Sequence, residues 1–290
     1  MRYVTFLHGD GPRVGVVRDG SIHPLPASAG SMRDVIERAA GAVPSSEAPI
    51  PLEGATLLAP VRPPKNVFCV GRNYMGHAEE IARTRGTELR LPSVPTFFTK
   101  ALTAVTDPGA TLHLSPDVSP QYDWEAELAV VIGKRCRDVP KERALSVVFG
   151  YTSLNDVTAR DLQREHQQWF KGKSLDETCP FGPWIVTADE LPQPGNLEIS
   201  LRLNGVTKQH ANTSQMIFDV PTIIASLSRG MTLEPGDVIA TGTPDGVGFA
   251  RTPPEFLADG DVMEVEIAGI GILRNTVSFE DRASSGRYRS

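Results

Sequence analysis

The stretch that decides both the fold and the chemistry runs from Tyr122 to Ile132 and reads YDWEAELAVVI. We predict a single strand over these residues, because the second half is a continuous apolar run of the length typical of a buried strand. Side chains two residues apart on a strand point to the same face, so Glu125 and Glu127 should project together. Two neighbouring carboxylates repel each other unless water, a proton or a cation separates them.

A third carboxylate follows the next apolar strand. The segment FGYTSLND ends in Asn155 and Asp156 and leads into a possible helix start. Three carboxylates without clustered cysteine or histidine select a hard, oxygen-preferring cation such as Mg2+ or Mn2+. Such an ion keeps coordination positions open for water or substrate, which Lewis-acid catalysis needs. On spacing alone, the alternative is that Glu125 and Glu127 line a solvated strand face and Asp156 caps a helix.

A histidine and a glutamate lie three residues apart after a glycine turn, in GRNYMGHAEE. A helix beginning near Tyr74 would place His77 and Glu80 on one face. A carboxylate bonded to one imidazole nitrogen fixes the tautomer, and the other nitrogen can take a proton from water. The alternative is an incidental pair on a surface helix. Lys173 in KGKS could stabilise an anion or lie at the surface, and its surroundings lack the spacing of a phosphate loop.

Composition bounds the class of protein. The 290 residues favour about two domains. Lys and Arg number 29 against 35 Asp and Glu, a net charge of −6, which argues against a general nucleic-acid binder. The apolar runs are too short to span a bilayer and the first residues do not read as a signal peptide, so we expect no membrane partner. Three scattered cysteines fit a reduced, cytoplasmic protein.

The pattern along the chain favours a mixed, mostly β architecture with a folded-over sheet or barrel core. The 26 glycines and 24 prolines indicate many short strands and tight loops. The regular alternation of strands and helices that is typical of a doubly wound fold is absent from the sequence pattern. We place a small N-terminal domain at residues 1–60 and the main unit at 61–290. Expected strands are 1–7, 14–17, 66–70, 147–154, 198–203, 237–240, 262–267 and 272–277, and expected helices are 31–40, 77–85, 141–148, 158–165 and 221–229.

Taken in order, these motifs resemble those of the fumarylacetoacetate hydrolase family over roughly residues 60–280. They are GRNY at 71–74 with His77 and Glu80, DWEAE at 123–127, NDVTARD at 155–161, KGKS at 171–174, GPW at 182–184, and EPGD at 234–237 leading into TGTP at 241–244. The resemblance implies a β-rich α+β fold with a mixed, barrel-like β-sheet roll behind a small N-terminal domain. It also implies a homodimer.

The resemblance further implies roles for individual residues. Glu125, Glu127 and Asp156 match the family's metal ligands, normally for Mg2+ or Mn2+. His77 and Glu80 match a dyad on a lid that closes over the substrate and positions a water. Lys173 matches the lysine that stabilises enolate charge. Positions similar to those that bind substrate are Tyr74, Arg160, Gln163 and Thr243. The stretch Gln167–Trp169 looks like the branch acting on 2,4-diketo-3-deoxy sugar acids.

The reaction first expected is metal-dependent hydrolysis of a carbon–carbon bond in a 2,4-dioxo acid, an acylpyruvate, to pyruvate and a carboxylic acid. Metal and Lys173 would stabilise the enolate, and His77 with Glu80 would deprotonate the attacking water. Oxaloacetate decarboxylation and tautomerisation or isomerisation of an unsaturated 2-oxo dicarboxylic acid reach the same enolate and stay open. The complete dyad favours hydrolysis over decarboxylation. A non-catalytic metal-binding protein is disfavoured because His77 and Lys173 are both present.

Overall fold

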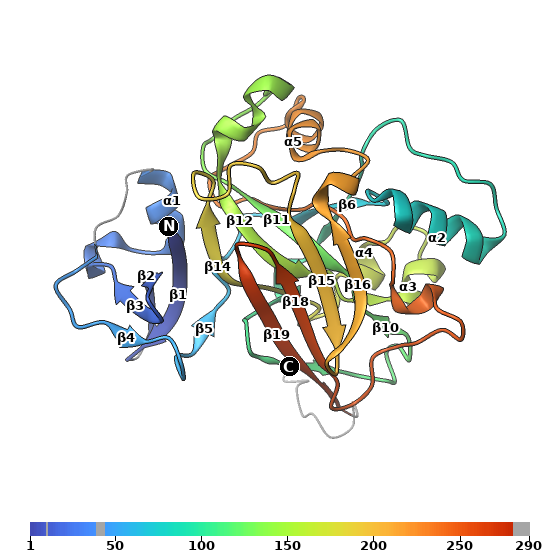
Figure 1. The fold of residues 1–290 in the computed structure, drawn as a ribbon, viewed down its shortest axis with the longest axis horizontal. Helices are drawn as coiled ribbons and strands as arrows, with labels where there is room; N and C mark the ends of the chain where they lie inside the picture. Colours follow the sequence, from blue (N-terminus) through green and yellow to red (C-terminus); the bar gives the residue numbers. More distant parts are fainter. Residues whose placement is uncertain (10, 39–43, 281–290) are drawn as a thin grey trace, which may run out of the picture.

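The apolar run of the quoted stretch forms β11, which lies in the middle of a mixed sheet (Figure 1). The computed structural model describes residues 1–9, 11–38 and 44–280. The sheet order is β4 (Ile50–Pro51), β3 (Ser21–Pro24), β2 (Gly11–Arg18), β1 (Arg2–His8), β14 (Cys179–Thr187), β12 (Val148–Asn155), β11 (Ala126–Ile132), β17 (Val238–Ala240), β6 (Val67–Gly71) and β7 (Thr96–Lys100). Two short strands extend it, since β5 (Leu57–Leu58) pairs with β1 and β8 (Val105–Thr106) pairs with β14.

A second sheet packs against this one. Its order is β16 (Val206–Asn212), β15 (Glu198–Leu203), β18 (Val262–Ile267), β19 (Gly271–Phe279) and β9 (Thr111–Leu114), and β10 (Tyr122–Asp123) pairs separately with β13 (Thr158–Ala159). The helices are α1 (Met32–Arg38), α2 (Met75–Arg85), α3 (Arg160–Glu165), α4 (Phe170–Lys173) and α5 (Val220–Ser228). Short 3-10 helices are η1 (Ala27–Ala29), η2 (Leu102–Ala104), η3 (Lys141–Val147), η4 (Thr213–Gln215) and η5 (Gly248–Ala250).

The core lies on both faces of β11. Leu128 and Val130 belong to the cluster shared with the second sheet, and Ala129 and Val131 belong to the cluster on the opposite face. Every residue of β11 is buried, which explains why the part of the strand from Leu128 to Ile132 is continuously apolar instead of alternating. A strand held from both sides is a rigid platform for the side chains at its ends.

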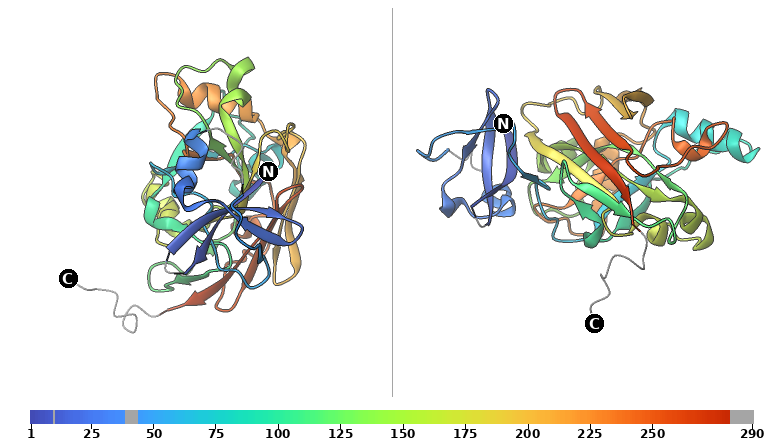
Figure 2. Two further views of the ribbon diagram at one scale, coloured as in Figure 1. Left: turned by 90° about the vertical axis from the view of Figure 1, so that its left-hand side faces the viewer. Right: turned by 90° about the horizontal axis from the view of Figure 1, so that it is seen from below.

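The N-terminal strands form a small unit at one end of the molecule, beside the larger one (Figure 2). They enclose their own apolar cluster, which includes Phe6 and Ile22. The strand β1 pairs antiparallel with β14 through Arg2 and Tyr3, so the unit continues the large sheet. Within the described residues the order ends at β4 and β7, which do not pair with each other. The fold is therefore a mixed, sheet-rich α+β fold with a small N-terminal domain, and the barrel that we expected does not close.

Several boundaries differ from the sequence prediction. The single strand predicted over Tyr122–Ile132 is wrong, because it breaks into β10 and β11 at Trp124 and Glu125. At this break, a side chain replaces the backbone hydrogen bonds of a strand, since the Glu125 N–H donates to Asn155 Oδ1 at 2.9 Å. The strand predicted from residue 147 and the helix predicted to 148 overlap. The structure divides them between η3 and β12, at Val147 and Val148.

Two helix predictions also shift. The segment 158–165 starts as the strand β13 and becomes helical only at Arg160. The helix predicted from Pro221 begins one residue earlier, because Asp219 Oδ1 accepts from the Thr222 N–H at 2.9 Å and caps it. The end of the helix predicted over 31–40 lies outside the described residues. All three cysteines are free thiols, and none of the helices described is long and apolar enough to cross a membrane.

Candidate active site

The three predicted metal ligands meet where β11 and β12 lie side by side. Glu125 precedes β11, Glu127 lies within it, and Asp156 directly follows β12, whose Leu154 is the register partner of Glu127. The Asp156 N–H donates to the Glu125 carbonyl at 2.9 Å. One carboxylate oxygen from each acid lies within 4.8 Å of the other two, and all three side chains are buried. The alternative that Glu125 and Glu127 line a solvated strand face is therefore excluded.

Cations surround two of these acids. Lys173 Nζ lies 2.7 Å from both Glu125 Oε2 and Asp156 Oδ2, and Lys100 Nζ lies 2.7 Å from Asp156 Oδ1. Burial alone would raise the pKa of Glu125, yet the charges of Lys173 and Arg160 lower that pKa to about 2. Lys173 is 2% exposed, so the surface alternative for this lysine is wrong.

Glu127 is different, because within the described chain it has no ion-pair partner. Its Oε2 accepts from the Gly242 N–H at 2.7 Å. Burial, followed by the charges of Asp156 and Glu125, raises the pKa of Glu127 well above its usual range. Three converging carboxylates, one of them without a cationic side chain within 4.0 Å in the described residues, fit a hard divalent cation such as Mg2+ or Mn2+. Glu125, Glu127 and Asp156 are the residues that would hold it.

The predicted dyad forms at the start of α2. His77 Nδ1 lies 3.2 Å from Glu80 Oε2, and Glu80 Oε1 accepts from the Gly246 N–H at 2.9 Å. Both side chains are buried, so the incidental surface pair is excluded. Since Glu80 holds Nδ1, the other ring nitrogen, Nε2, is left for proton transfer.

A cavity of about 470 Å3 brings most of the candidate residues together. Its lining includes His77, Glu125, Glu127, Arg160, Gln163, Lys173 and Thr243. Asp156 and Glu80 lie behind this surface and contact it through Lys173 and His77. Tyr74 does not line the cavity. It precedes α2 with its ring in the core, and its buried hydroxyl has no hydrogen-bond partner among the residues that the structure describes.

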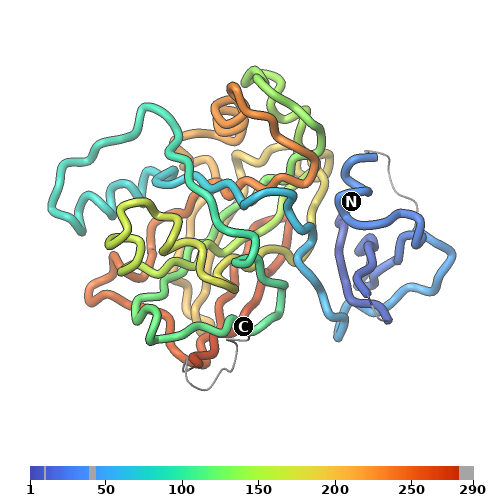
Figure 3. The backbone as a smooth tube through the Cα atoms, turned by 180° about the vertical axis from the view of Figure 1, so that it is seen from behind, coloured from blue at the N-terminus to red at the C-terminus, as the bar shows by residue number. Residues whose placement is uncertain are grey.

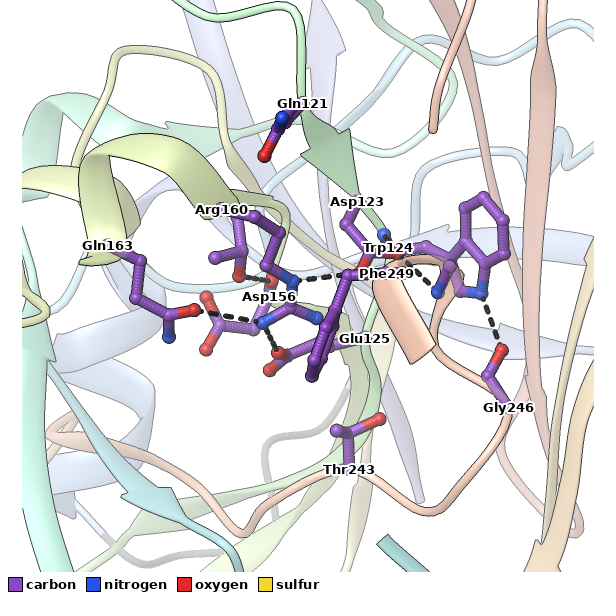
Figure 4. A network of polar contacts seen from close by, with 12 residues as sticks. Gln121, Asp123, Trp124, Glu125, Asp156, Arg160, Gln163, Thr243, Gly246 and Phe249 are labelled. Carbon is purple, nitrogen blue, oxygen red and sulfur yellow. Dashed lines mark hydrogen bonds and ion pairs between the residues drawn. The ribbon is translucent and has the colours of Figure 1, made fainter. Parts of the chain in front are cut away.

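Arg160 is held rigidly at one side of the triad (Figure 4). Its Nε donates to Asp123 Oδ2 at 2.8 Å, and its Nη1 contacts Glu125 Oε1 at 2.6 Å and Gln163 Oε1 at 3.2 Å. The guanidinium carbon lies 4.5 Å from the centre of the Phe249 ring. In the described part of the chain its buried Nη2 has no hydrogen-bond partner, so the two N–H groups of this nitrogen remain for an anionic ligand.

Sequence reasoning assigned no role to several residues that build this site. Asp123 accepts hydrogen bonds from Arg160 and from the Gly248 and Phe249 N–H groups, and Lys100 pairs with Asp156. Gln209 donates to Thr243 Oγ1 at 2.8 Å and thereby orients that hydroxyl. Asp123 belongs to the DWEAE motif, so its position in the sequence could have indicated a role in the site. Lys100 and Gln209 come from strands that contain no recognisable motif.

The fold and the site together define a class of proteins that hold a carboxylate triad and a His–Glu pair in one buried cavity of a mixed sheet. Residues 66–278 match the family described as fumarylacetoacetate (FAA) hydrolase C-terminal, and residues 1–60 match the one described as Rv2993c-like, N-terminal. The chain belongs to the fumarylacetoacetate hydrolase family and is an enzyme of that family.

Two curated relatives are oxaloacetate tautomerases. The chain is 48% identical to oxaloacetate tautomerase YisK of Bacillus subtilis over 227 residues, which cover 78% of this chain and 74% of the relative. It is 39% identical to the mitochondrial oxaloacetate tautomerase fahd2 of Xenopus laevis over 294 residues, which cover 96% of this chain and 90% of the relative.

Solved structures of the family share the whole fold. The fumarylacetoacetate hydrolase of Exiguobacterium antarcticum has a TM-score of 0.86 and 43% identity, covering 97% of this chain and 100% of that chain. The 5-carboxymethyl-2-hydroxymuconate delta-isomerase of Mycobacterium smegmatis has a TM-score of 0.81 and 34% identity, with the same coverage. These names give no support to the sugar-acid branch expected from Gln167–Trp169.

Proposed function

We propose that this enzyme catalyses keto–enol tautomerisation of a 2-oxo acid, with oxaloacetate as the first candidate substrate. The observation that carries the proposal is that His77, held by Glu80, lines the same cavity as Glu125 and Glu127. A proton-transfer group beside a site for a divalent cation is what enolisation next to a keto group requires. The oxaloacetate tautomerases of Bacillus subtilis and Xenopus laevis, to which the chain is similar, support this choice.

Hydrolysis of an acylpyruvate, the reaction first expected from the sequence, becomes the second candidate. The expectation rested on the complete His77–Glu80 dyad, which decarboxylation does not need. Tautomerisation uses the same dyad, because a base must remove a proton from carbon and return it to oxygen. The dyad therefore does not distinguish hydrolysis from tautomerisation, and the tautomerases of Bacillus subtilis and Xenopus laevis favour tautomerisation.

In the proposed mechanism, Glu125, Glu127 and Asp156 would hold a divalent cation, which would supply Lewis-acid catalysis for enolisation. Arg160, with its unpartnered Nη2, binds and orients a carboxylate of the substrate. His77 Nε2 takes the proton from C3 of the keto form, so that a C–H bond breaks and the electron pair forms the C2–C3 double bond. Lys173 stabilises the negative charge that develops on the C2 oxygen. Return of the proton to that oxygen completes the enol, and the reverse sequence gives the keto form.

The test follows the enol of oxaloacetate by its ultraviolet absorbance, with Mg2+ or Mn2+ and with EDTA. We expect metal-dependent interconversion in the wild type and a loss of about 100-fold or more in His77→Ala, in line with the usual contribution of a general base. Pyruvate release from oxaloacetate and from acylpyruvates is measured in parallel. Faster pyruvate release from an acylpyruvate than tautomerisation would favour hydrolysis instead.

The organisation of the protein is a further part of the proposal. We propose a homodimer with the domain boundary after residue 60, as the family resemblance implied. Light scattering coupled to size-exclusion chromatography measures the mass in solution, to be compared with 31.4 kDa for one chain. A mass of one chain at all concentrations would contradict the dimer.

A further inference from the structure

We propose that Arg72 and Arg85 form an outer carboxylate subsite, which binds the terminal carboxylate of a 2-oxo dicarboxylic acid longer than oxaloacetate. The inference rests on the proposed function, because the 2-oxo acid end of the same molecule must bind at the triad. It assigns a specificity-determining role to two arginines that the mechanism above does not use.

The helix α2 presents the proton-transfer group and one of these arginines on the same face. His77, Ile81 and Arg85 follow each other at four-residue spacing, and all three line the cavity. A rise of 1.5 Å per residue places the Cα of Arg85 about 12 Å further along the helix than that of His77, and side chains on a helix lean towards its N-terminus, which brings the guanidinium closer to His77. In oxaloacetate the second carboxylate is bonded to the reacting carbon itself and lies beside His77. Arg85 is therefore placed for a carboxylate that at least two further carbon atoms separate from C3.

Arg72 also lines the cavity, and it lies against a pair of aromatic rings. Its guanidinium carbon lies 5.4 Å from the centre of the Trp169 ring, which meets the Phe98 ring edge-on at 5.3 Å. A Cβ on Gly71 would collide with Trp169, so only glycine allows the indole to pack here. Arg72 itself adopts a left-handed φ of 55°, which turns the chain sharply between β6 and α2. The N–H groups of a guanidinium point outward in its own plane, so one that lies beside an aromatic ring can still donate to a carboxylate.

Neither arginine has an acidic partner within 4.0 Å in the described part of the chain. Arg160 in the same cavity differs, because it pairs with Asp123 and Glu125. Arg72 is an exposed residue, and partial desolvation, followed by the charge of Arg85, lowers its pKa, so the two guanidinium groups act on each other. A carboxylate between them would relieve this repulsion and gain charge-assisted hydrogen bonds.

The space beyond the arginines accommodates a longer molecule. A second cavity of about 520 Å3 shares Arg72, Ile81 and Arg85 with the first and continues to Arg90 and Pro92. Figure 3 shows α2 and the loop that follows it at the end of the molecule opposite the N-terminal strands. The two cavities thus adjoin at the proposed subsite, with the triad on the inner side and the loop after α2 on the outer side.

The test compares binding of matched acids to the Mg2+-loaded enzyme by calorimetry. The probes are 2-oxoadipate, a six-carbon diacid, and 2-oxohexanoate, which has a methyl group in place of its terminal carboxylate. We expect the wild type to bind 2-oxoadipate at least 10-fold more tightly, and Arg72→Gln/Arg85→Gln to lose that preference. Affinity for oxaloacetate should change less than about threefold, because its second carboxylate lies inside the arginines.

Arg83→Gln is the matched control. Arg83 lies in the same last turn of α2 but lines neither cavity, so this variant removes a helix-end charge without touching the subsite. Equal weakening of 2-oxoadipate, 2-oxohexanoate and oxaloacetate by the double variant would indicate a merely structural role and overturn the proposal. So would a wild type without preference for the diacid. Deuterium exchange at C3, followed by NMR, tests the proposed function separately, because binding without exchange contradicts tautomerisation and leaves the subsite standing.

Discussion

Glu80 accepts a hydrogen bond from the Gly246 N–H through one carboxylate oxygen and holds His77 through the other. The same side chain thus joins α2 to the loop that carries Thr243. Gly76 of α2 also packs on Asp245, leaving no room for a Cβ at that position. The orientation of the proton-transfer group and the position of the loop are therefore coupled through one carboxylate.

Glu80→Gln should impair the reaction while keeping the fold. The amide oxygen can still accept from Gly246, but the amide nitrogen would then face His77 Nδ1 as a donor and force the wrong tautomer. We expect kcat to fall by about 100-fold or more, with KM changing much less. Steady-state kinetics and thermal unfolding measure the two effects. Glu79→Gln, at the exposed neighbouring position, is the control, and equal activity of the two variants would refute the tautomer role.

Metal binding should stabilise the wild type and not a triad variant. A ligand at 100 times its dissociation constant stabilises the native state by about 2.7 kcal/mol. We expect Mg2+ or Mn2+ to raise Tm by several degrees in the wild type. In Glu127→Gln the affinity should fall on the order of 100-fold, because a charged ligand is lost. Calorimetric titration against the EDTA-treated protein checks this, and unchanged affinity in the variant would remove Glu127 from the ligand set.

The raised pKa of Glu127 predicts a pH dependence of the metal-free protein. A carboxyl group whose pKa is higher in the folded chain binds its proton more tightly there than in the unfolded chain. Stability is therefore lost as pH rises above the usual glutamate value of about 4.3 towards the raised value. Glu127→Gln does not titrate at this position, so in EDTA its Tm should exceed that of the wild type increasingly from pH 5 to pH 8. Parallel Tm curves over this range would contradict the prediction.

Asp123→Asn should destabilise the protein although it changes few atoms. All the groups around Asp123 are donors, namely the Arg160 side chain and the N–H groups of Trp124, Gly248 and Phe249. An amide NH2 has no acceptor there, and Arg160 loses a buried counter-charge. Breaking a buried ion pair typically costs about 3–5 kcal/mol, which corresponds to a fall in Tm of roughly 5–15 °C. Asp117→Asn, at an exposed position, should leave Tm unchanged.

The sequence predicted which acids meet, but for a partly incorrect reason. Two-residue spacing placed Glu125 and Glu127 on one strand face, whereas Glu125 lies just outside β11. The acids still converge, because Asn155 and Gln209 hold the backbone at Glu125 and Ala126. Those side chains come from distant segments, and local periodicity contains no information on them.

Other parts of the fold could not be predicted because their residue types are typical of a different structure or because they depend on distant contacts. The strand β14 contains Pro180, Gly182 and Pro183, which usually mark loops. Lys100 ends β7 as a lysine would at a surface, yet its side chain is fully buried against Asp156. Arg72 and Trp169 are nearly a hundred residues apart, so their contact follows only from the tertiary fold.

The pairing of β1 with β14 has a consequence for how this protein can be divided. Residues Arg2 and Tyr3 occupy hydrogen-bonding positions beside Val186 and Ile185. A fragment beginning at residue 61 would leave that edge of β14 unpaired, as a template for adding strands from other molecules. The N-terminal residues thus cover an edge of the main sheet. We expect a chain shortened to begin at residue 61 to aggregate, even though it keeps every residue of the candidate active site.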